Sequence, residues 1–330
     1  MNSRTVNVTE ESFTTLTDIW KGPNRLEWNS IFILPAWLQT WWQEFGRGEK
    51  PYLLNVKSGD ISSGIAPLLF NNDSASFLGN IDVCDYQDFI VVPGTENDFC
   101  NTLFEELKKR GISQLDLGLV RPDSVIMTSL VPLAREKGYT VNVVQEDVSP
   151  EMELPLTYEQ YLASLDGKQR HELNRKFRNA AAEGNLNYRT VRGKSELAKT
   201  LDIFFKMFTE SRHDKANFLT TDMATFFRSL VEATAETGLA RIGVLDLDNV
   251  AVAMVLYFDY QDCMYLYNSG YDPRYESLSA GLLCKALCIK SGIETGVKTF
   301  NFLKGSESYK YRLGGKEVPL YRCGIMLGKG

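Results

Sequence analysis

The sequence is poor in the residues that build metal sites. Two histidines, His171 and His213, are the only ones among 330 residues, and they lie far apart in the chain. Six cysteines show one short spacing, Cys284 and Cys288, which are one helical turn apart in an apolar segment. Free cysteines in such segments are usually buried and behave as small apolar residues. We therefore expect reduced core thiols and no bound metal.

Long apolar runs are also missing. The longest, Val250–Phe258, is far shorter than the roughly 20 residues that a helix needs to cross a bilayer. Residues 1–20 lack the charged start and apolar run of a secretory signal. These absences predict a cytoplasmic protein without a transmembrane segment.

The charge is acidic and unevenly distributed. The net charge is −6; residues 1–150 carry 12 Lys and Arg against 20 Asp and Glu, whereas residues 151–330 carry 24 against 22. General nucleic-acid binding is therefore disfavoured. An anionic ligand is expected to bind in the second half of the chain.

The length suits two domains, which we place at residues 1–150 and 151–330, joined at 150–155. Apolar periodicity in the first half predicts an α/β unit. Its helices are expected at 13–20, 35–45, 96–110 and 123–137, and its strands at 52–57, 64–70, 75–78, 88–92, 114–118 and 139–144.

The second half shows a similar order of elements. Helices are predicted at 157–182, 195–212, 222–236 and from about 279 to 292, and strands at 186–191, 239–247, 250–260, 263–270, 299–303 and 319–326. Residues 247–250 contain Asp and Asn, which tolerate the positive φ of a tight hairpin turn. An antiparallel series of strands, followed by a loop and a helix, therefore characterises this half.

The stretch 263–305 contains the most informative connection. Its strand ends at a Gly-Tyr-Asp-Pro cluster, and a loop at 273–281 precedes the helix. A helix N-terminus with small residues beside it can hold a phosphate through backbone N–H groups. The loop is therefore either an anion site or an ordinary connection with a serine cap.

Several segments of the chain carry a family resemblance. KQRHELNRKFRNAAAEG (168–184), FFKMFTESRHDKANFL (204–219), YNSGYDPRYESLSAGLL (267–283), FNFLKGSESYKYRLG (300–314) and VCDYQDFIV (83–91) resemble segments of the GNAT acyltransferase superfamily. Their order resembles the double-domain branch called BioF2-like or CelD-like acetyltransferases, relatives of the Fem aminoacyl transferases. Thr209 and His213 depart from the family pattern, so no catalytic histidine is carried over.

The resemblance implies two GNAT-like domains, each with a mixed, mostly antiparallel sheet flanked by helices. It implies direct transfer of an acyl group from acetyl-CoA or another acyl-CoA to an amine. The second domain would hold the acyl-CoA, and the first, a degenerate copy, would contribute to the substrate cleft. The expected cofactor-binding residues are Tyr267, Asn268, Ser269, Gly270, Arg274, Ser277, Ser279, Ala280 and Gly281.

Within this scheme, Tyr309 is the expected acid for the departing thiolate. Lys310 would stabilise negative charge or hold an acceptor carboxylate; the alternative is a buried tyrosine beside a surface lysine. Asp85 is expected as the base or amine-binding group, with Glu307 in reserve. Strand alternation would place Asp85 on the face opposite Tyr86 and Asp88.

Acceptor-binding residues are expected on both halves: Tyr86, Asp88, Arg175, Arg178 and Arg212. Arg175 and Arg178 belong to a basic helical stripe with Lys168 and His171, which is either a solvated face or a site for an acidic acceptor or CoA phosphates. The acceptor is expected to be a small-molecule or cell-envelope/polysaccharide-precursor amine.

Two other functions are compatible with the sequence. One is aminoacyl transfer from charged tRNA, as in the Fem relatives, although the net charge and the lack of an inserted coiled-coil-like arm argue against it. The other is a non-catalytic protein that binds acyl-CoA or a partner.

Overall fold

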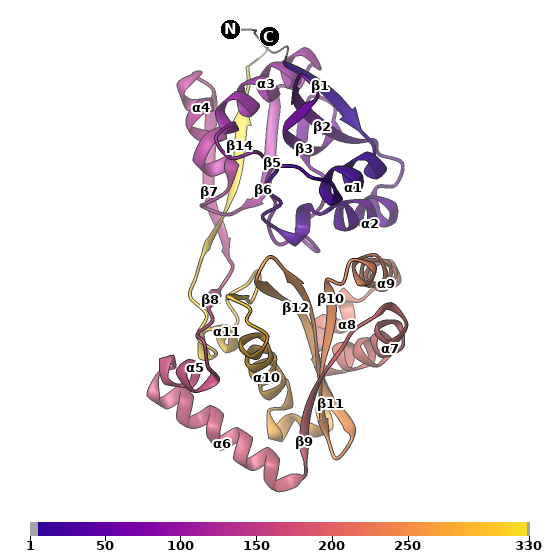
Figure 1. The fold of residues 1–330 in the computed structure, drawn as a ribbon, viewed down its shortest axis with the longest axis vertical. Coiled ribbons are helices and arrows are strands. Elements are labelled where there is room, and N and C mark those ends of the chain that lie inside the picture. Colours follow the sequence, from indigo (N-terminus) through magenta and orange to yellow (C-terminus); the bar gives the residue numbers. More distant parts are fainter. Residues whose placement is uncertain (1–5, 329–330) are drawn as a thin grey trace. The chain divides into compact units, whose positions relative to one another are not determined.

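The chain folds into two compact units, each with its own sheet, in a computed structural model that describes residues 6–328 (Figure 1). Unit 1 combines the residues up to Val148 with those from Val318 onward, and unit 2 comprises Ser149–Glu317. The chain therefore enters unit 2 once and returns to unit 1 for its final strand.

That final strand lies in a different unit from the one that the sequence predicted. β14 (Pro319–Met326) pairs antiparallel with β6 (Gln114–Val120) and β7 (Thr140–Val148) in the sheet of unit 1. Its Cys323 and Ile325 are fully buried in the core of that unit. The sequence assigned this strand to the domain 151–330 because of its position in the chain. The apolar face of β14 is covered only in unit 1.

Because β14 belongs to unit 1, the charge is divided between the two units differently from what the sequence predicted. Unit 1 carries 14 Lys and Arg against 20 Asp and Glu, and unit 2 carries 22 against 22. The slight positive excess expected for the second half therefore disappears. Anion binding by unit 2 must come from the local arrangement of its cations rather than from its net charge.

The sheet of unit 1 has the order β1-β2-β3-β4-β6-β14-β7, with β5 pairing with β3. Its pairs are antiparallel except for β4 and β6. The remaining strands are β1 (Val6–Glu11), β2 (Pro51–Ser58), β3 (Ile61–Asn71), β4 (Ser74–Phe77) and β5 (Ile90–Val91). The sequence had not indicated β1, in which most side chains are exposed or half-buried.

Unit 1 has the expected helices, with one change. They are α1 (Phe13–Lys21), η1 (Ile31–Ile33), α2 (Pro35–Phe45), α3 (Glu96–Lys109), η2 (Ile126–Leu130) and α4 (Val131–Glu136). Only residues 126–136 of the predicted helix 123–137 are helical, and the first turn is of π type. The Asp88 carboxylate caps this turn by accepting hydrogen bonds from the N–H groups of Val125 and Ile126.

The sheet of unit 2 has the order β8-β13-β12-β11-β10-β9. These strands are β8 (Glu151–Glu153), β9 (Leu186–Val191), β10 (Ala240–Leu247), β11 (Val250–Tyr260), β12 (Cys263–Tyr271) and β13 (Thr299–Asn301). The predicted hairpin between β10 and β11 is confirmed, because Asp248 and Asn249 have φ values of 48° and 65°. β12 and β13 are parallel, and the other pairs are antiparallel.

The helices of unit 2 cover both faces of its sheet, with α7 and α9 on one side and α5, α6 and α10 on the other (Figure 1). They are α5 (Tyr158–Ser164), α6 (Gly167–Glu183), α7 (Lys194–Ser211), α8 (His213–Phe218), α9 (Thr221–Glu236), η3 (Pro273–Leu278), α10 (Ala280–Glu294) and α11 (Ser308–Arg312). Both units are thus mixed α/β layers, as the sequence predicted.

The predicted long helix 157–182 is two helices. The chain is extended at Leu165 and Asp166, and the Asp166 carboxylate accepts a hydrogen bond from the N–H of Lys168, which starts α6 afresh. Leu165 is buried in the core of unit 2 at this break. An aspartate within an apolar helical pattern therefore acted as a cap.

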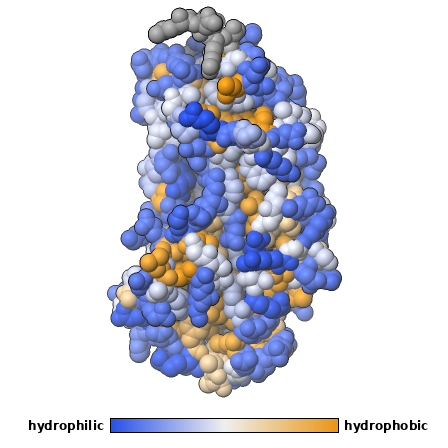
Figure 2. Space-filling view, in the orientation of Figure 1, coloured by the Kyte–Doolittle hydropathy of each residue, from blue (hydrophilic) through white to orange (hydrophobic). Residues whose placement is uncertain are grey.

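Figure 2 shows one face covered mostly by hydrophilic residues, with small separate apolar patches. No helix between residues 6 and 328 is long and apolar enough to cross a bilayer.

Candidate active site

The central feature of unit 2 is the point where β12 and β13 separate. The two strands pair from Cys263 with Thr299 to Tyr265 with Asn301, and β13 then ends. β12 continues to Tyr271 and is paired along this length with β11 on its other side. Within the described chain, the edge of β12 beyond Tyr265 is not covered by a strand. Such an edge presents backbone N–H and C=O groups to a ligand.

A β-bulge marks the same part of β12. Leu256 of β11 lies opposite Asn268 and Tyr257 opposite Leu266, so Tyr267 is the extra residue on β12. The ring of Tyr267 packs against that of Phe227, with centroids 5.6 Å apart, on the side of α9. The bulge therefore bends β12 where it parts from β13.

A lysine from α8 reaches the free edge of β12. The Nζ of Lys215 donates a hydrogen bond to the carbonyl oxygen of Ser269, and it lies 4.9 Å from the ring centroid of Phe208. Because the N–H and C=O of one strand residue point to the same side, the backbone of Ser269 faces the free edge. The predicted ligand-binding residue Ser269 is thus well placed, but Lys215 occupies its carbonyl.

The predicted open loop at 273–281 is mostly a 3₁₀ helix, η3. Arg274 is tied to Asp272 by a two-pronged ion pair with contacts of 2.6 and 3.0 Å. Ser279 follows in the left-handed conformation, with φ 57°, and its Oγ accepts a hydrogen bond of 2.6 Å from the Nζ of Lys176 on α6. A cation other than Arg274 therefore stands at the N-terminus of α10.

The small residues around this loop have packing roles. A side chain at Gly270 would lie 2.5 Å from the backbone nitrogen of Phe208, so this glycine lets α7 approach β12 closely. Ala280 is only 2% exposed. Gly281 lies against the ring of Tyr271, where a Cβ would be at 3.1 Å. Gly270 and Ala280 thus serve the core rather than offering an open approach to a ligand.

A surface pocket of about 440 Å³ lies on the outer side of η3. The predicted residues Arg274 and Ser277 line it, together with the carboxylates of Glu183 and Asp248. These two negative charges oppose a phosphate in this pocket. A phosphate is better placed on the side of Lys176.

Lys310 is the most completely bonded charge in the site. It is 2% exposed, and its Nζ donates to the carbonyl oxygens of Leu303, Lys304 and Gly305 and lies 2.9 Å from the Glu307 carboxylate. The sequence predicted that Lys310 would stabilise reaction charge or hold a substrate carboxylate. Its donors are instead used to fix the turn after β13.

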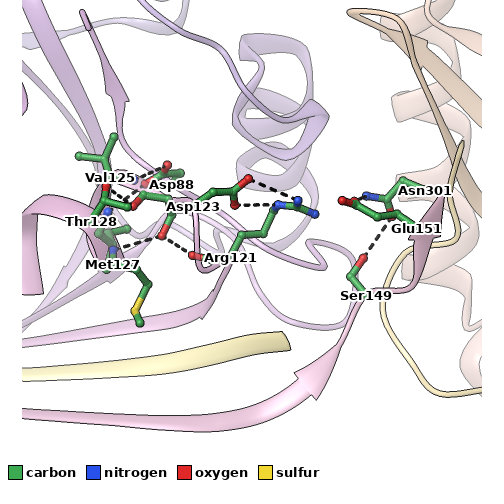
Figure 3. A network of polar contacts seen from close by, with 11 residues as sticks. Asp88, Arg121, Asp123, Val125, Met127, Thr128, Ser149, Glu151 and Asn301 are labelled. Atoms are coloured by element: carbon green, nitrogen blue, oxygen red, sulfur yellow. Dashed lines mark hydrogen bonds and ion pairs between the residues drawn. The ribbon is translucent and has the colours of Figure 1, made fainter. Parts of the chain in front are cut away.

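The same turn is held from the other side by Asn301. Its Oδ1 accepts hydrogen bonds from the N–H of Leu303 and the hydroxyl of Ser149, and its Nδ2 donates to Glu151 (Figure 3). Leu303 has a φ of 61°, a conformation that costs energy for a residue with a side chain. The buried side chains of Asn301 and Lys310 therefore maintain the direction in which the chain leaves β13 and turns away from β12.

Tyr309 follows this turn on α11 and is half-buried. Its ring lies edge-on to Phe302, with centroids 6.5 Å apart, and the Nζ of Lys285 on α10 is 4.7 Å from the ring centroid. The predicted acid is thus in unit 2, beside a cation.

Lys285 and Lys215 are the functional candidates that the sequence did not reveal. Burial lowers the pKa of Lys285 to about 8. Burial lowers the pKa of Lys215 to about 7, and the nearby positive charges of Lys285 and Arg212 act in the same direction. A signal existed for Lys285, because it interrupts an otherwise apolar helix, where a charged residue is unusual. Lys215 lies in a short helix that the apolar pattern did not indicate.

The basic stripe on α6 is solvent-exposed. Lys168, His171, Arg175 and Arg178 all lie on the surface, and Arg175 forms a two-pronged ion pair with Glu172. Arg212 is also exposed and pairs with Asp214. Arg175 and Arg212 are accessible to a ligand but already have carboxylate partners.

In unit 1 the segment 83–89 is irregular, so the strand alternation expected for Asp85, Tyr86 and Asp88 does not apply. Tyr86 and Asp88 line the same small pocket, with Arg121 and Asp123. Asp88 is buried, and its carboxylate accepts hydrogen bonds from three backbone N–H groups, part of the network in Figure 3. Asp85 is half-buried. It precedes Tyr86 in the chain, but it does not line this pocket. The expected base and the expected acid therefore lie in different units.

Residues 167–311, from the start of α6 to α11, match the family model of the acetyltransferase (GNAT) domain. The match covers 145 of the 330 residues, so this segment is similar to a GNAT domain. It contains the separation of β12 and β13, the start of α10 and Tyr309. A comparison with curated proteins finds no match.

Solved structures show the same fold over both units. FemX is 13% identical, with a TM-score of 0.62 and 96% of each chain covered. The C-terminal domain of a putative lysylphosphatidylglycerol synthetase from Agrobacterium fabrum is 11% identical, with a TM-score of 0.56 and coverage of 88% of this chain and 91% of that one. A tandem GNAT protein from the clavulanic acid biosynthesis pathway is 11% identical, with a TM-score of 0.50 and coverage of 99% and 100%. At these identities the similarity establishes the fold alone.

The network around Asp88 generates a prediction for the stability of unit 1. Asp88→Ala leaves three buried N–H groups without acceptors and should lower the free energy of unfolding by about 2 kcal/mol, and Asp88→Asn, which keeps one oxygen, by less. All five tryptophans lie between residues 20 and 42, so tryptophan fluorescence in urea follows unit 1 selectively. Asp123→Ala, which removes an exposed carboxylate, is the matched control.

The same carboxyl should make unit 1 sensitive to pH. Burial raises the pKa of Asp88 to about 7, against the hydrogen bonds, which lower it. The folded state then holds a proton that the unfolded state releases above about pH 4, so stability should fall as the pH rises from about 4 to 7. Asp88→Asn should remove this part of the pH dependence; an unchanged profile would show that the carboxyl is ionised throughout.

Proposed function

We propose that the protein is an acyl-CoA-dependent N-acyltransferase whose donor site lies in unit 2. The observation that carries this proposal is the free edge of β12 beyond Tyr265, inside the segment that matches the GNAT domain. The pantetheine arm of CoA contains two amides and no charge. It can pair with a strand edge as an added strand would. The donor thioester would then lie near the separation of β12 and β13.

The start of α10 is the proposed position of the CoA pyrophosphate. The first N–H groups of a helix have no acceptor within the helix, and the helix dipole favours an anion there. Lys176 adds a positive charge at Ser279. Lys176 also lies 3.4 Å from the Glu172 carboxylate, a looser pairing than the 2.6 Å contact that engages Arg274 with Asp272, and Ser277 is exposed on η3. We therefore assign the main counter-charge to Lys176.

The transfer requires one bond to form and one to break. The acceptor nitrogen attacks the thioester carbonyl carbon, the C–S bond breaks, and the departing thiolate takes a proton. We propose Tyr309 as the donor of that proton, because it is half-buried beside the turn that follows β13. Lys285, close to its ring, favours the negative charge that develops on the phenolate.

The group that removes the proton from the acceptor ammonium is proposed from two candidates. Glu307 is half-exposed in unit 2 and pairs with Lys310 at 2.9 Å. Asp85 lies in unit 1, which we propose contributes to acceptor binding with Tyr86 and Asp88. The acceptor itself is proposed to be a small-molecule or cell-envelope/polysaccharide-precursor amine.

The donor assignment predicts a charge effect at the start of α10. Ser279→Asp should weaken acetyl-CoA binding about tenfold, because it places a carboxylate beside the proposed pyrophosphate position. Isothermal titration calorimetry measures the affinity. The wild type and the aspartate variant should use S-acetyl-N-acetylcysteamine, an acyl donor without the phosphates, equally well. Ser195→Asp, at an exposed position of α7, is the matched control; an equal acetyl-CoA affinity in both variants would exclude this pyrophosphate position.

The acid assignment predicts a kinetic effect at Tyr309. Tyr309→Phe should lower kcat roughly a hundredfold and leave the acetyl-CoA affinity unchanged, since the ring packing is kept and only the proton donor is lost. Transfer to a panel of amines, followed by release of CoA thiol, gives the rate. Tyr311→Phe, on the same helix as Tyr309, removes the hydroxyl that donates a hydrogen bond to Glu317, and it should leave the rate unchanged.

Two results would redirect the assignment. Full activity of Tyr309→Phe would remove this residue from the mechanism. Transfer that requires charged tRNA and ignores acyl-CoA would replace the proposed donor by an aminoacyl-tRNA.

A further inference from the structure

One buried and one half-buried lysine of unit 2, Lys285 and Lys215, lack a counter-ion. Lys285 is 7% exposed and donates one hydrogen bond of 3.1 Å, to the carbonyl of Gly281 in its own helix. Lys215 is half-buried and donates one, to the carbonyl of Ser269. Within residues 6–328, neither ammonium group lies within ion-pair distance of a carboxylate. An ammonium group has three N–H donors, so most of the donors of this pair are left for a ligand.

A third lysine of unit 2, Lys310, has a buried charge that nearby acceptors compensate. Lys310 is 2% exposed, and its Nζ contacts three carbonyl oxygens and the carboxylate of Glu307. A buried charge without such partners is costly to the folded state. The fold therefore compensates Lys310 fully and leaves Lys215 and Lys285 to be compensated by something else.

The charges that surround the pair do not supply this compensation. Arg212, Asp214 and Glu307 are the charged groups that act on Lys215 besides Lys285, and Glu307 and Arg212 also act on Lys285. Arg212 and Asp214 are paired with each other, with contacts of 2.8 and 2.9 Å. Glu307 is held by Lys310. The local balance around the two lysines is therefore positive.

The position of the pair indicates which substrate brings the anion. Lys215 stands at the free edge of β12, and Lys285 stands over the ring of Tyr309, the proposed proton donor. The pantetheine arm that would lie here is uncharged, and the phosphates of CoA would lie at the start of α10. An anion that is bound beside Tyr309 before the reaction begins therefore comes from the second substrate.

We propose that Lys215 and Lys285 form a subsite for an acidic group of the acceptor, a carboxylate or a phosphate. The acceptor is then an amine that also carries an acid, and the two ammonium groups hold that acid while the amine faces the thioester. This assignment rests on the proposed function, because the acyltransferase reaction defines which molecule is the acceptor.

Binding of an acid at this subsite should be coupled to protons. The pKa values of Lys215 and Lys285 are lowered to about 7 and about 8, mainly by burial, and Lys285 and Arg212 lower that of Lys215 further. An anion between them favours the charged forms and raises both values. The complex should therefore take up protons at pH 7.5, and its affinity should fall as the pH rises above about 7.

Calorimetry without any acyl donor tests the subsite. The probes are β-alanine and O-phosphoethanolamine, compared with β-alaninamide and ethanolamine, which keep the amine and lack the acidic group. The wild type should bind at least one acidic probe ten times or more tighter than its counterpart, with proton uptake measured in two buffers of different ionisation enthalpy. The better acidic probe identifies the group as a carboxylate or a phosphate.

Three variants complete the experiment. Lys215→Met and Lys285→Met should each lose tenfold or more in affinity for the acidic probe. Lys290→Met, which removes a half-exposed lysine paired with Glu294 on the same helix, should bind as the wild type does. Because an uncompensated buried charge is removed, the first two variants should also melt no lower than the wild type.

Three outcomes would overturn the proposal. The acidic probes could bind no tighter than the amines that lack the acidic group, or Lys215→Met and Lys285→Met could bind the acidic probe as tightly as Lys290→Met does. The third is a melting temperature of Lys215→Met and Lys285→Met well below that of the wild type. The proposed function fails separately. Tight, lysine-dependent binding of an acidic probe without acyl transfer from acyl-CoA would contradict the proposed reaction and support the subsite. Acyl transfer at the same rate to acceptors with and without an acidic group would support the reaction and contradict the subsite.

Discussion

The parting of β12 and β13 is the constraint on which the structure of unit 2 depends. Parallel pairing over three residues fixes the two strands together at one end. The bulge at Tyr267 and the turn after Asn301 then direct them apart. Lys310 holds this turn through buried hydrogen bonds, so a charge that is 2% exposed helps to fix where α11, with Tyr309, begins. The free edge of β12 is therefore a maintained feature of the fold.

Electrostatics in this unit is a matter of local arrangement. Unit 2 has equal numbers of positive and negative side chains, yet lysines from α6, α8 and α10 converge on the edge of β12 and the start of α10. Most surface arginines are paired with nearby carboxylates, and Lys215 and Lys285 are not. Two lysines without a carboxylate partner thus lie at the free edge of β12 and beside Tyr309.

The sequence predicted elements whose cause is local. Helix 35–45 has a strong aromatic period with proline at its first position, and the hairpin at 247–250 has the residues that its turn needs. What it missed depends on contacts between distant residues. β14 joins unit 1 because its buried face fits there, and residues 83–89 are irregular because Asp88 caps a turn far along the chain. Lys310 was read as reactive because its acceptors, three carbonyls in a turn, are invisible in a pattern of side chains.

Hydrogen–deuterium exchange, with and without saturating acetyl-CoA, tests the central claim most directly. If the pantetheine arm pairs with the free edge of β12, amide exchange should slow in peptides that cover residues 266–271 and 279–283, because their N–H groups gain acceptors. The tryptophan-rich segment 20–42 of unit 1 should exchange at its original rate. Acetyl-CoA that binds without slowing exchange in residues 266–271 would contradict the account.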